Sequence, residues 1–333
     1  MADQTCYLQL AEAVGTGDSK YIPQIFEVLA NEKEARLLLA ASPPATAAEL
    51  SEKTGLPQTE IEQMVGPLFT KGVLLKSKKP DGIRYYRVRH FIQMHDATAV
   101  MIDAPQKMLD LWKSFMAEEF VGYNRALEEV LPKAVMRIIP VNVAVTPEAK
   151  ILALDDVKQL VDNARSLAVT RCSCRVIDGK CGKPIEVCVQ VDKAADYSIE
   201  RGTGRPIDKA EALELMKRCE EEGLIHVSDN ARAPGHVICN CCSDCCLAWP
   251  SVRTGLGRFV SPSRFAAKVN PDACSACETC LERCYFEAIS MAGPNDTAKV
   301  DADKCMGCGL CLVTCPEDAI SLREIRSENF VPE

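Results

Sequence analysis

The sequence predicts an α+β protein of several domains, and three observations support this. Apolar residues recur at helical spacing in the first part of the chain, and two short strand patterns follow them. Of the 19 cysteines, all but Cys6 lie after residue 171. The C-terminal part contains an internal repeat. We therefore expect four parts: a helical domain ending in a hairpin, a helical connector, a cysteine-rich α/β domain and a duplicated module. These span residues 20–95, 96–165, 166–260 and 265–325.

Composition narrows the class of protein. A hydrophobic fraction of 47%, a charged fraction of 26% and a net charge of −8 are typical of a soluble globular protein, and the acidic balance argues weakly against nucleic acid as the main partner. No stretch approaches the roughly 20 apolar residues of a membrane span, and the N-terminus has no secretory signal pattern. We expect a cytoplasmic protein without membrane insertion. Clustered cysteines in a reducing compartment then indicate metal or redox chemistry.

The N-terminal domain follows a helix-rich pattern. AAELSEKTG predicts a short helix ending at Gly55, and a helix over residues 60–70 is expected to begin at an N-cap Thr59 and to stop at Gly72. Strands are expected at 73–75 and 83–88 around a Lys-Pro-Asp-Gly turn. Helices followed by a hairpin resemble a winged helix. The segment ATAAELSEKTGLPQTEIEQMVGPLFTKGVL resembles the helix-turn-helix of many bacterial regulators.

Charges within this domain favour one kind of partner. The predicted hairpin and its C-terminal flank carry six basic residues, which are Lys76, Lys78, Lys79, Arg84, Arg87 and Arg89. The predicted recognition helix instead begins with Glu60 and Glu62, whereas a helix that reads DNA bases offers Arg, Lys, Asn or Gln there. We therefore favour a protein-docking or homodimerisation role, and DNA binding stays open as the alternative.

Further helices are expected beyond this domain. The connector has an apolar helix face made by Met108, Leu109, Leu111, Trp112, Phe115 and Met116. A helix is expected over 155–168 and another over 207–223, where acidic residues lie early and Gly223 lies at the end. A strand should follow at 224–227.

The C-terminal module is a duplication of a four-cysteine motif. Each element of the first half recurs 31 residues later, and each half has the spacing C-x2-C-x2-C-x3-C. Three thiolates at this spacing can surround one [4Fe–4S] cluster, and the fourth reaches the other cluster. Cluster one is thus assigned to Cys274, Cys277, Cys280 and Cys315, and cluster two to Cys305, Cys308, Cys311 and Cys284.

Zinc fits the C-terminal pattern poorly, because zinc sites use Cys pairs separated by longer gaps. The module resembles bacterial two-cluster ferredoxins over about 60 residues. Cys315 is followed by Pro316, as in that family, whereas Cys284 is followed by Tyr285. The missing proline is expected to loosen one turn without removing a ligand.

The middle domain contains a second concentration of thiols. Nine cysteines lie in two groups, which are Cys172, Cys174, Cys181 and Cys188, then Cys239, Cys241, Cys242, Cys245 and Cys246. Metal binding is the expected reason, by one or two further [4Fe–4S] clusters or by zinc. We select Cys172, Cys174, Cys241 and Cys245 as the candidate ligands, with Arg171 and Arg175 offsetting their negative charge.

A wider resemblance covers most of the chain. The CxCR motif at Cys172 and the ICNCC motif at Ile238, ahead of the double cluster, are similar to those of uncharacterised anaerobe 4Fe–4S proteins with a winged-helix-like start. The resemblance implies anaerobic electron transfer. We expect a protein that relays low-potential electrons between redox protein partners, as a carrier or subunit without catalytic residues of its own. Alternatives are a redox-responsive winged-helix regulator and an oxidoreductase with a substrate-binding cluster in the middle domain.

Overall fold

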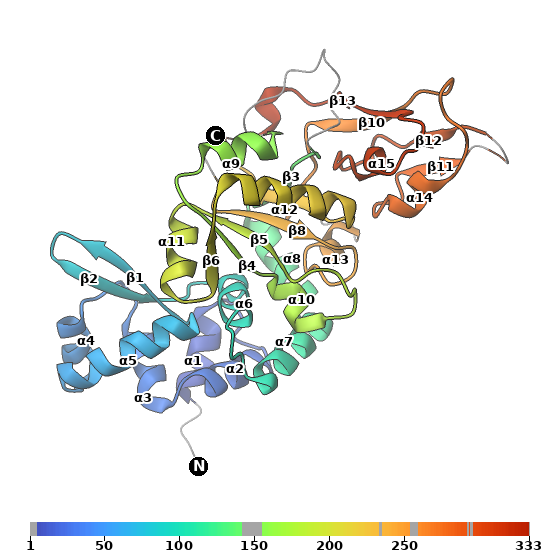
Figure 1. The fold of residues 1–333 in the computed structure, drawn as a ribbon. Coiled ribbons are helices and arrows are strands. Elements are labelled where there is room, and N and C mark those ends of the chain that lie inside the picture. The colour runs from blue at the N-terminus through green and yellow to red at the C-terminus, as the bar shows by residue number, and fades with distance from the viewer. Residues whose placement is uncertain are drawn as a thin grey trace. The chain divides into compact units, whose positions relative to one another are not determined.

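The computed structural model describes residues 5–141, 155–232, 235–253, 259–291, 293 and 296–332 (Figure 1). The chain forms two compact units. The first contains residues 1–126, 173–179 and 201–203, and the second contains residues 127–172, 180–200 and 204–333. The predicted connector is thus divided between the two units.

The first unit consists of helices and one hairpin. In chain order these are α1 (Thr5–Ala13), α2 (Ile22–Leu29), α3 (Glu32–Ala40), α4 (Ala47–Thr54), α5 (Gln58–Lys71), β1 (Leu74–Lys79), β2 (Gly82–Arg87), α6 (Phe91–Ala99), α7 (Gln106–Glu118), the start of α8 (Phe120–Val130) and α10 (Ser173–Asp178). Aromatic rings fill its core, where Phe91 and Trp112 each meet Phe115 edge to face at 5.7 Å. Trp112 lies on the apolar face predicted for the connector, and it is fully buried.

Helix boundaries in this unit follow from capping. Thr46 begins α4 through a capping box with Glu49, and Gly55 ends it at φ +71°. Helix α5 begins at Gln58, two residues earlier than predicted, after Pro57 rather than Thr59. Pro57 needs no backbone N–H donor there, and its fixed φ suits the start of a helix. Strands β1 and β2 pair antiparallel from Leu74–Arg87 to Lys79–Gly82; β2 is close to its predicted range, whereas β1 runs four residues beyond the predicted end at Leu75.

His90 makes the stability of the first unit depend on pH. Its Nδ1 accepts a hydrogen bond from the Ile92 N–H at 3.2 Å and caps α6, while burial lowers its pKa below the ordinary value. The unfolded chain therefore takes up this proton more readily, so stability should fall as the pH drops below about 6.5, by at most a cap's contribution of about 1 kcal/mol. Unfolding of wild type and His90→Asn between pH 7.5 and 5.5 measures this. The Asn cap does not titrate, and equal pH slopes would contradict the prediction.

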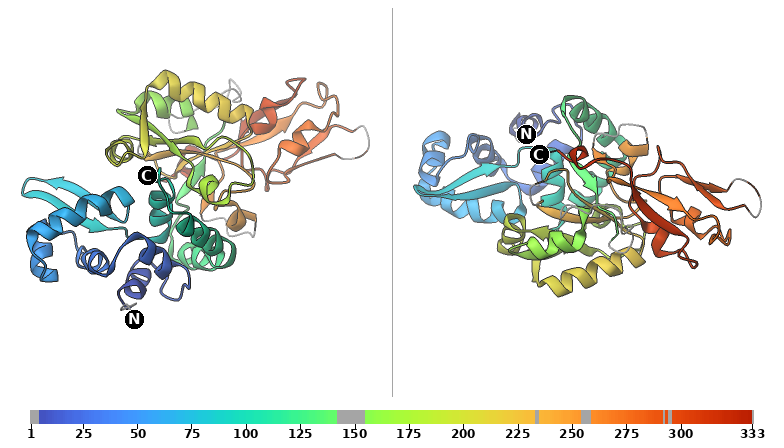
Figure 2. Two further views of the ribbon diagram at one scale, coloured as in Figure 1. Left: turned by 60° about the horizontal axis from the view of Figure 1, so that its bottom comes forward. Right: turned by 90° about the horizontal axis from the view of Figure 1, so that it is seen from above.

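The second unit is built on a seven-stranded sheet of order β6-β4-β5-β8-β7-β3-β9. Its strands are β3 (Met136–Ile138), β4 (Leu167–Arg171), β5 (Glu186–Val191), β6 (Gly204–Ile207), β7 (Ile225–Asp229), β8 (Val237–Cys241) and β9 (Val260–Ser261). The described pairs are antiparallel except β3 with β9. The helices of this part are α9 (Val157–Asn163), α11 (Lys193–Glu200), α12 (Lys209–Glu221) and α13 (Trp249–Arg253). Helix α12 runs across one face of the sheet (Figure 2).

The helix predicted over 155–168 is shorter than expected. Helix α9 starts after the N-cap Asp156 and ends at Asn163, and Leu167 already belongs to β4. Leu167–Thr170 pair with β5 on one side and β6 on the other, and all four are buried. Tertiary pairing of this apolar, partly β-branched segment therefore overrides its helical periodicity.

A duplicated module of short elements follows the edge strand β9, coloured orange to red in Figure 2. Its elements are β10 (Phe265–Val269), α14 (Thr279–Arg283), β11 (Ile289–Met291), β12 (Ala298–Val300), α15 (Leu310–Val313) and β13 (Ile320–Glu324). Strands β10 and β13 pair antiparallel, as do β11 and β12. Across the described residues, none of the helices has the length and apolarity needed to cross a membrane.

A buried ion network links the module to the sheet. Asp155 accepts from Arg137 Nη1 of β3 at 3.2 Å and from Arg264 Nη1 at 2.7 Å, and Arg264 also pairs with Glu324 of β13. Asp155 is 2% exposed, Arg137 1% and Arg264 0%. Burial lowers the pKa of Arg137 to about 10. The two buried guanidinium groups thus share the Asp155 carboxylate, and Arg264 has Glu324 as a second partner.

Candidate metal centres

The two halves of the module use the same local geometry. The Cys274 N–H donates to Asn270 O at 3.1 Å, and the Cys305 N–H donates to Asp301 O at 3.0 Å. Three backbone positions in each half have positive φ, at the same 31-residue displacement, and they are Ala276, Glu278 and Glu287, then Gly307, Gly309 and Asp318. Left-handed residues turn the chain sharply, so each loop can direct several thiols to one space.

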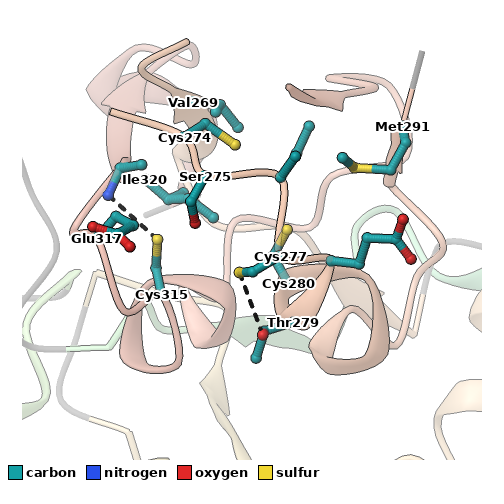
Figure 3. A pocket seen from close by; sticks show the side chains of 14 residues that line it. Val269, Cys274, Ser275, Cys277, Thr279, Cys280, Met291, Cys315, Glu317 and Ile320 are labelled. Carbon is teal, nitrogen blue, oxygen red and sulfur yellow. Dashed lines mark hydrogen bonds between the residues drawn. The ribbon is translucent and has the colours of Figure 1, made fainter. Parts of the chain in front are cut away.

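The first pocket brings together the cysteines assigned to cluster one. Cys274, Cys277 and Cys280 line it from one loop, and Cys315 lines it from the other half. Figure 3 shows these four side chains around the same space, which has a volume of about 360 Å³. Val269 and Ile320, paired across β10 and β13, also line it, so the site has an apolar wall.

The second pocket contains the four cysteines assigned to cluster two. Cys305, Cys308 and Cys311 share a space of about 340 Å³ with Cys284 from the first half. The structure thus places the eight cysteines in the crossed sets that the spacing predicts. Helices α14 and α15 pack together, and the charge of Cys280 acts on Cys311, so the two pockets are neighbours.

Hydrogen-bond donors at the sulfur atoms fit thiolate-bound clusters. Backbone N–H groups of Ala288 and Ala319 point at Cys284 and Cys315, each at 3.3 Å from the sulfur. The Ala267 N–H approaches Cys305 Sγ at 3.5 Å. Such donors stabilise the negative charge that a thiolate ligand carries. The donor set and the four-thiol pockets therefore suit [4Fe–4S] clusters.

The two pockets differ in the exposure of one thiol, although each also holds a buried one whose pKa is raised by burial, Cys280 in the first and Cys311 in the second. Cys277 is exposed, and the Thr279 hydroxyl donates to its sulfur at 3.4 Å, which together with a backbone donor lowers the pKa of this thiol. Burial raises the pKa of Cys308 to about 12 and also raises that of Cys311. Loading the second pocket must therefore release protons from thiols that hold them tightly.

Gly307 lets the second loop pass close to its neighbours. A Cβ here would lie 2.1 Å from Phe265 O and 2.2 Å from Ser263 Oγ, and the φ of +66° is unfavourable for alanine. Gly307→Ala should therefore displace the loop and lose about four iron atoms per chain. Gly55→Ala is the matched control, since it has a φ of +71° and nothing within 4 Å. Iron analysis of both variants tests this, and full iron content in Gly307→Ala would contradict it.

Residues that flank Cys284 attach this half of the module to helix α12. Arg283 Nη2 donates to Glu220 O and Glu221 O, each at 2.7 Å, and the Tyr285 hydroxyl donates to Gly223 O. The last two carbonyls of α12 thus receive a cation, which suits a helix C-terminus, and the carbonyl of Gly223 just beyond the helix receives a hydroxyl. Tyr285, which replaces the expected proline, therefore makes a contact that proline could not. Burial raises its pKa to about 12.

The middle cysteines of the second unit form two sets. In the first, the neighbouring thiols of Cys172 and Cys239 raise the pKa of Cys188, and those of Cys239 and Cys246 raise the pKa of Cys241. The sheet explains this, because Cys188 in β5 pairs with Thr170 in β4, two residues before Cys172, and lies beside Cys239 in β8. In the second set, Cys181, Cys242 and Cys245 have their sulfur atoms within 4.8 Å of one another.

The four middle cysteines selected from sequence are distributed among these sets. Cys172 and Cys241 belong to the first set and Cys245 to the second, while Cys174 lies on α10 in the first unit. Their joint ligation of one metal stays a prediction. Sequence reasoning left out Cys181, Cys188 and Cys239, whose closeness to the others results from strand pairing between distant segments.

Comparison with known families bears on the module alone. Residues 267–322 match the family model of a 4Fe–4S dicluster domain. No curated protein matches the chain. The match supports [4Fe–4S] cluster binding and iron–sulfur electron transfer in general.

Proposed function

We propose that this protein relays low-potential electrons between redox protein partners, with one [4Fe–4S] cluster in each pocket of the module. The observation that carries the proposal is the crossed arrangement of cysteines in two neighbouring pockets. Clusters of this type supply one-electron redox chemistry. The chain holds the two sites close together and leaves Cys277 of the first pocket exposed.

The exposed thiol of Cys277 gives the relay a direction. Added negative charge is disfavoured beside the buried Cys305 and Cys311, and it is favoured beside Cys277, which has solvent and the Thr279 hydroxyl. We therefore assign the exit for electrons to the face of Cys277. The partner that accepts them docks there, and cluster two lies on the side of the middle domain, where Arg283 and Tyr285 attach it.

Replacing Thr279 tests this assignment. Thr279→Val removes the hydroxyl donor at Cys277 Sγ, so the reduction potential of cluster one should become more negative, while that of cluster two stays unchanged. Thr314→Val is the control, since its hydroxyl donates to Cys311 O and not to a sulfur atom. Redox titration followed by EPR measures both potentials. An unchanged potential in Thr279→Val would contradict the assigned exit.

Anaerobic purification with iron and sulfide analysis tests the proposed function itself. We expect about eight iron and eight sulfide atoms per chain from the module, and two interacting EPR signals after reduction. Further clusters at the first set of middle thiols would add about four iron atoms each. A protein that contains zinc in place of iron at the module, or clusters that no reductant changes, would overturn the proposal.

For the N-terminal part we propose a winged-helix-like domain that docks a protein partner or a second copy of the chain. The supporting arrangement is α3, α4 and α5 followed by the β1–β2 hairpin, with Ala45 bridging Tyr85 of β2. Basic residues of the hairpin are engaged within the unit: Arg84 pairs with Glu49 and Asp81, and Arg87 donates to Ala13 O. This favours docking over DNA. Sequence-specific retardation of genomic DNA fragments under anaerobic conditions would overturn it.

A further inference from the structure

Three cysteines of the middle domain converge outside the ferredoxin pockets. Cys181 comes from the segment between α10 and β5, and Cys242 and Cys245 come from the turn after β8. Their three sulfur atoms lie within 4.8 Å of one another. Cys242 is 1% exposed and Cys245 5%, so two of the three thiols are shielded from solvent.

Local contacts hold the three thiols in place. The Cys245 N–H donates to Cys242 Sγ at 3.3 Å, and the Cys181 sulfur lies within 4.8 Å of the sulfur atoms of both. Trp249 Nε1 donates to Cys242 O at 2.6 Å, and its buried ring meets Phe286 edge to face at 5.5 Å. Phe286 also lines the second ferredoxin pocket, so its contact with Trp249 connects the three-thiol group to the wall of that pocket.

The spacing of the sulfur atoms distinguishes this group from the cluster sites. A tetrahedral zinc ion with Zn–S bonds of about 2.3 Å places two sulfurs about 3.8 Å apart. A cubane binds its thiolates on four different irons and so holds them further apart. Within the described part of the chain, no other trio of metal-ligating side chains meets the 4.8 Å limit, and the eight ferredoxin cysteines are among those that do not. The group is therefore too compact for a cubane and suits one ion.

We propose that Cys181, Cys242 and Cys245 together bind a single thiophilic divalent ion, for which zinc is the best fit, at a site separate from the iron–sulfur clusters. Three thiolates fill three positions of a tetrahedral ion, and an exchangeable ligand such as water takes the fourth. Thiolate ligands select soft or borderline ions over magnesium or calcium.

Metal analysis of cysteine variants tests the site. Protein purified anaerobically from zinc-supplemented cells should contain about one zinc per chain, and Cys242→Ala and Cys245→Ala should each lose it with the iron content unchanged. Cys219→Ala is the control: it removes a buried thiol of α12 that is outside the group, and it should keep the zinc. If the buried variants fail to fold, Cys181→Ser, at a less buried position, gives the same comparison.

Cobalt(II) added to zinc-depleted protein is the second measurement, because a thiolate-bound cobalt ion has a strong sulfur charge-transfer absorption that should disappear in Cys181→Ser. No zinc and no cobalt band would overturn the proposal. A loss of about four iron atoms in Cys242→Ala would also overturn it, by showing a cubane at these residues.

The site does not depend on the proposed electron transfer. EPR signals of the module should persist in Cys242→Ala, and their absence from wild type would reject the electron transfer alone.

Discussion

Cys315→Ala should lose the cluster of the opposite half of the module. Its sulfur lies in the pocket of Cys274, Cys277 and Cys280, although its sequence neighbours Cys308 and Cys311 line the other pocket. A pocket with three thiolates leaves one iron of a cubane without its ligand, so we expect the iron content to fall by about four per chain. Iron and sulfide analysis after anaerobic purification measures this.

Double variants identify which cluster is lost. Adding Cys277→Ala to Cys315→Ala should cause no further loss, because both residues serve one site, whereas adding Cys308→Ala should remove about eight iron atoms in total. Cys6→Ala, on α1 in the first unit, is the control for thiol removal. The reverse pattern, with Cys308→Ala silent in the Cys315→Ala background, would show sequential rather than crossed ligation.

Asp155→Ala should destabilise the second unit by about 3–5 kcal/mol, because it removes the buried carboxylate that pairs with the guanidinium groups of both Arg137 and Arg264. Arg137 belongs to the sheet and Arg264 to the start of the module. Removing the carboxylate should therefore weaken the packing of the module against the sheet. Urea unfolding of the iron-loaded protein, followed by circular dichroism under anaerobic conditions, measures the change.

Glu324→Ala is the matched comparison for the same network. Its carboxylate also pairs with Arg264, but its side chain is 31% exposed, and Asp155 remains to compensate the arginine. We expect a loss of about 1 kcal/mol or less. Asp155→Asn, which keeps the size of the side chain, should fall between the two. Equal losses for Asp155→Ala and Glu324→Ala would show that the burial of Asp155 is not what makes it important.

The module could be predicted from sequence because its information is local. Eight cysteines and the residues around them recur 31 positions apart, and the predicted range of 265–325 encloses the matched range of 267–322. The ends of α4 and α5 were similarly readable, since Gly55 and Gly72 adopt the left-handed conformation that ends a helix.

The thiol sets of the middle domain could not be predicted in this way. Cys181 meets Cys242 across a gap of about sixty residues only because β5 pairs with β8, and that pairing is not encoded by the spacing of cysteines. The early end of α9 could not be predicted for the same reason. Leu167 and its neighbours pair with strands that lie later in the chain. The departure at Tyr285 was visible in the sequence, but its hydrogen-bond partner at Gly223 was not.

The contact between α12 and the module has a mechanical consequence. Arg283 and Tyr285 hold the end of α12, and they are the two residues on either side of Cys284. A Cβ at Gly223 would lie 2.6 Å from the guanidinium of Arg283 and 2.9 Å from the Tyr285 hydroxyl, so a side chain here would displace the ends of both residues. A shift of this end of α12 would therefore move the segment that carries Cys284. Cys284 is the one thiol that the first half of the module places in the second pocket.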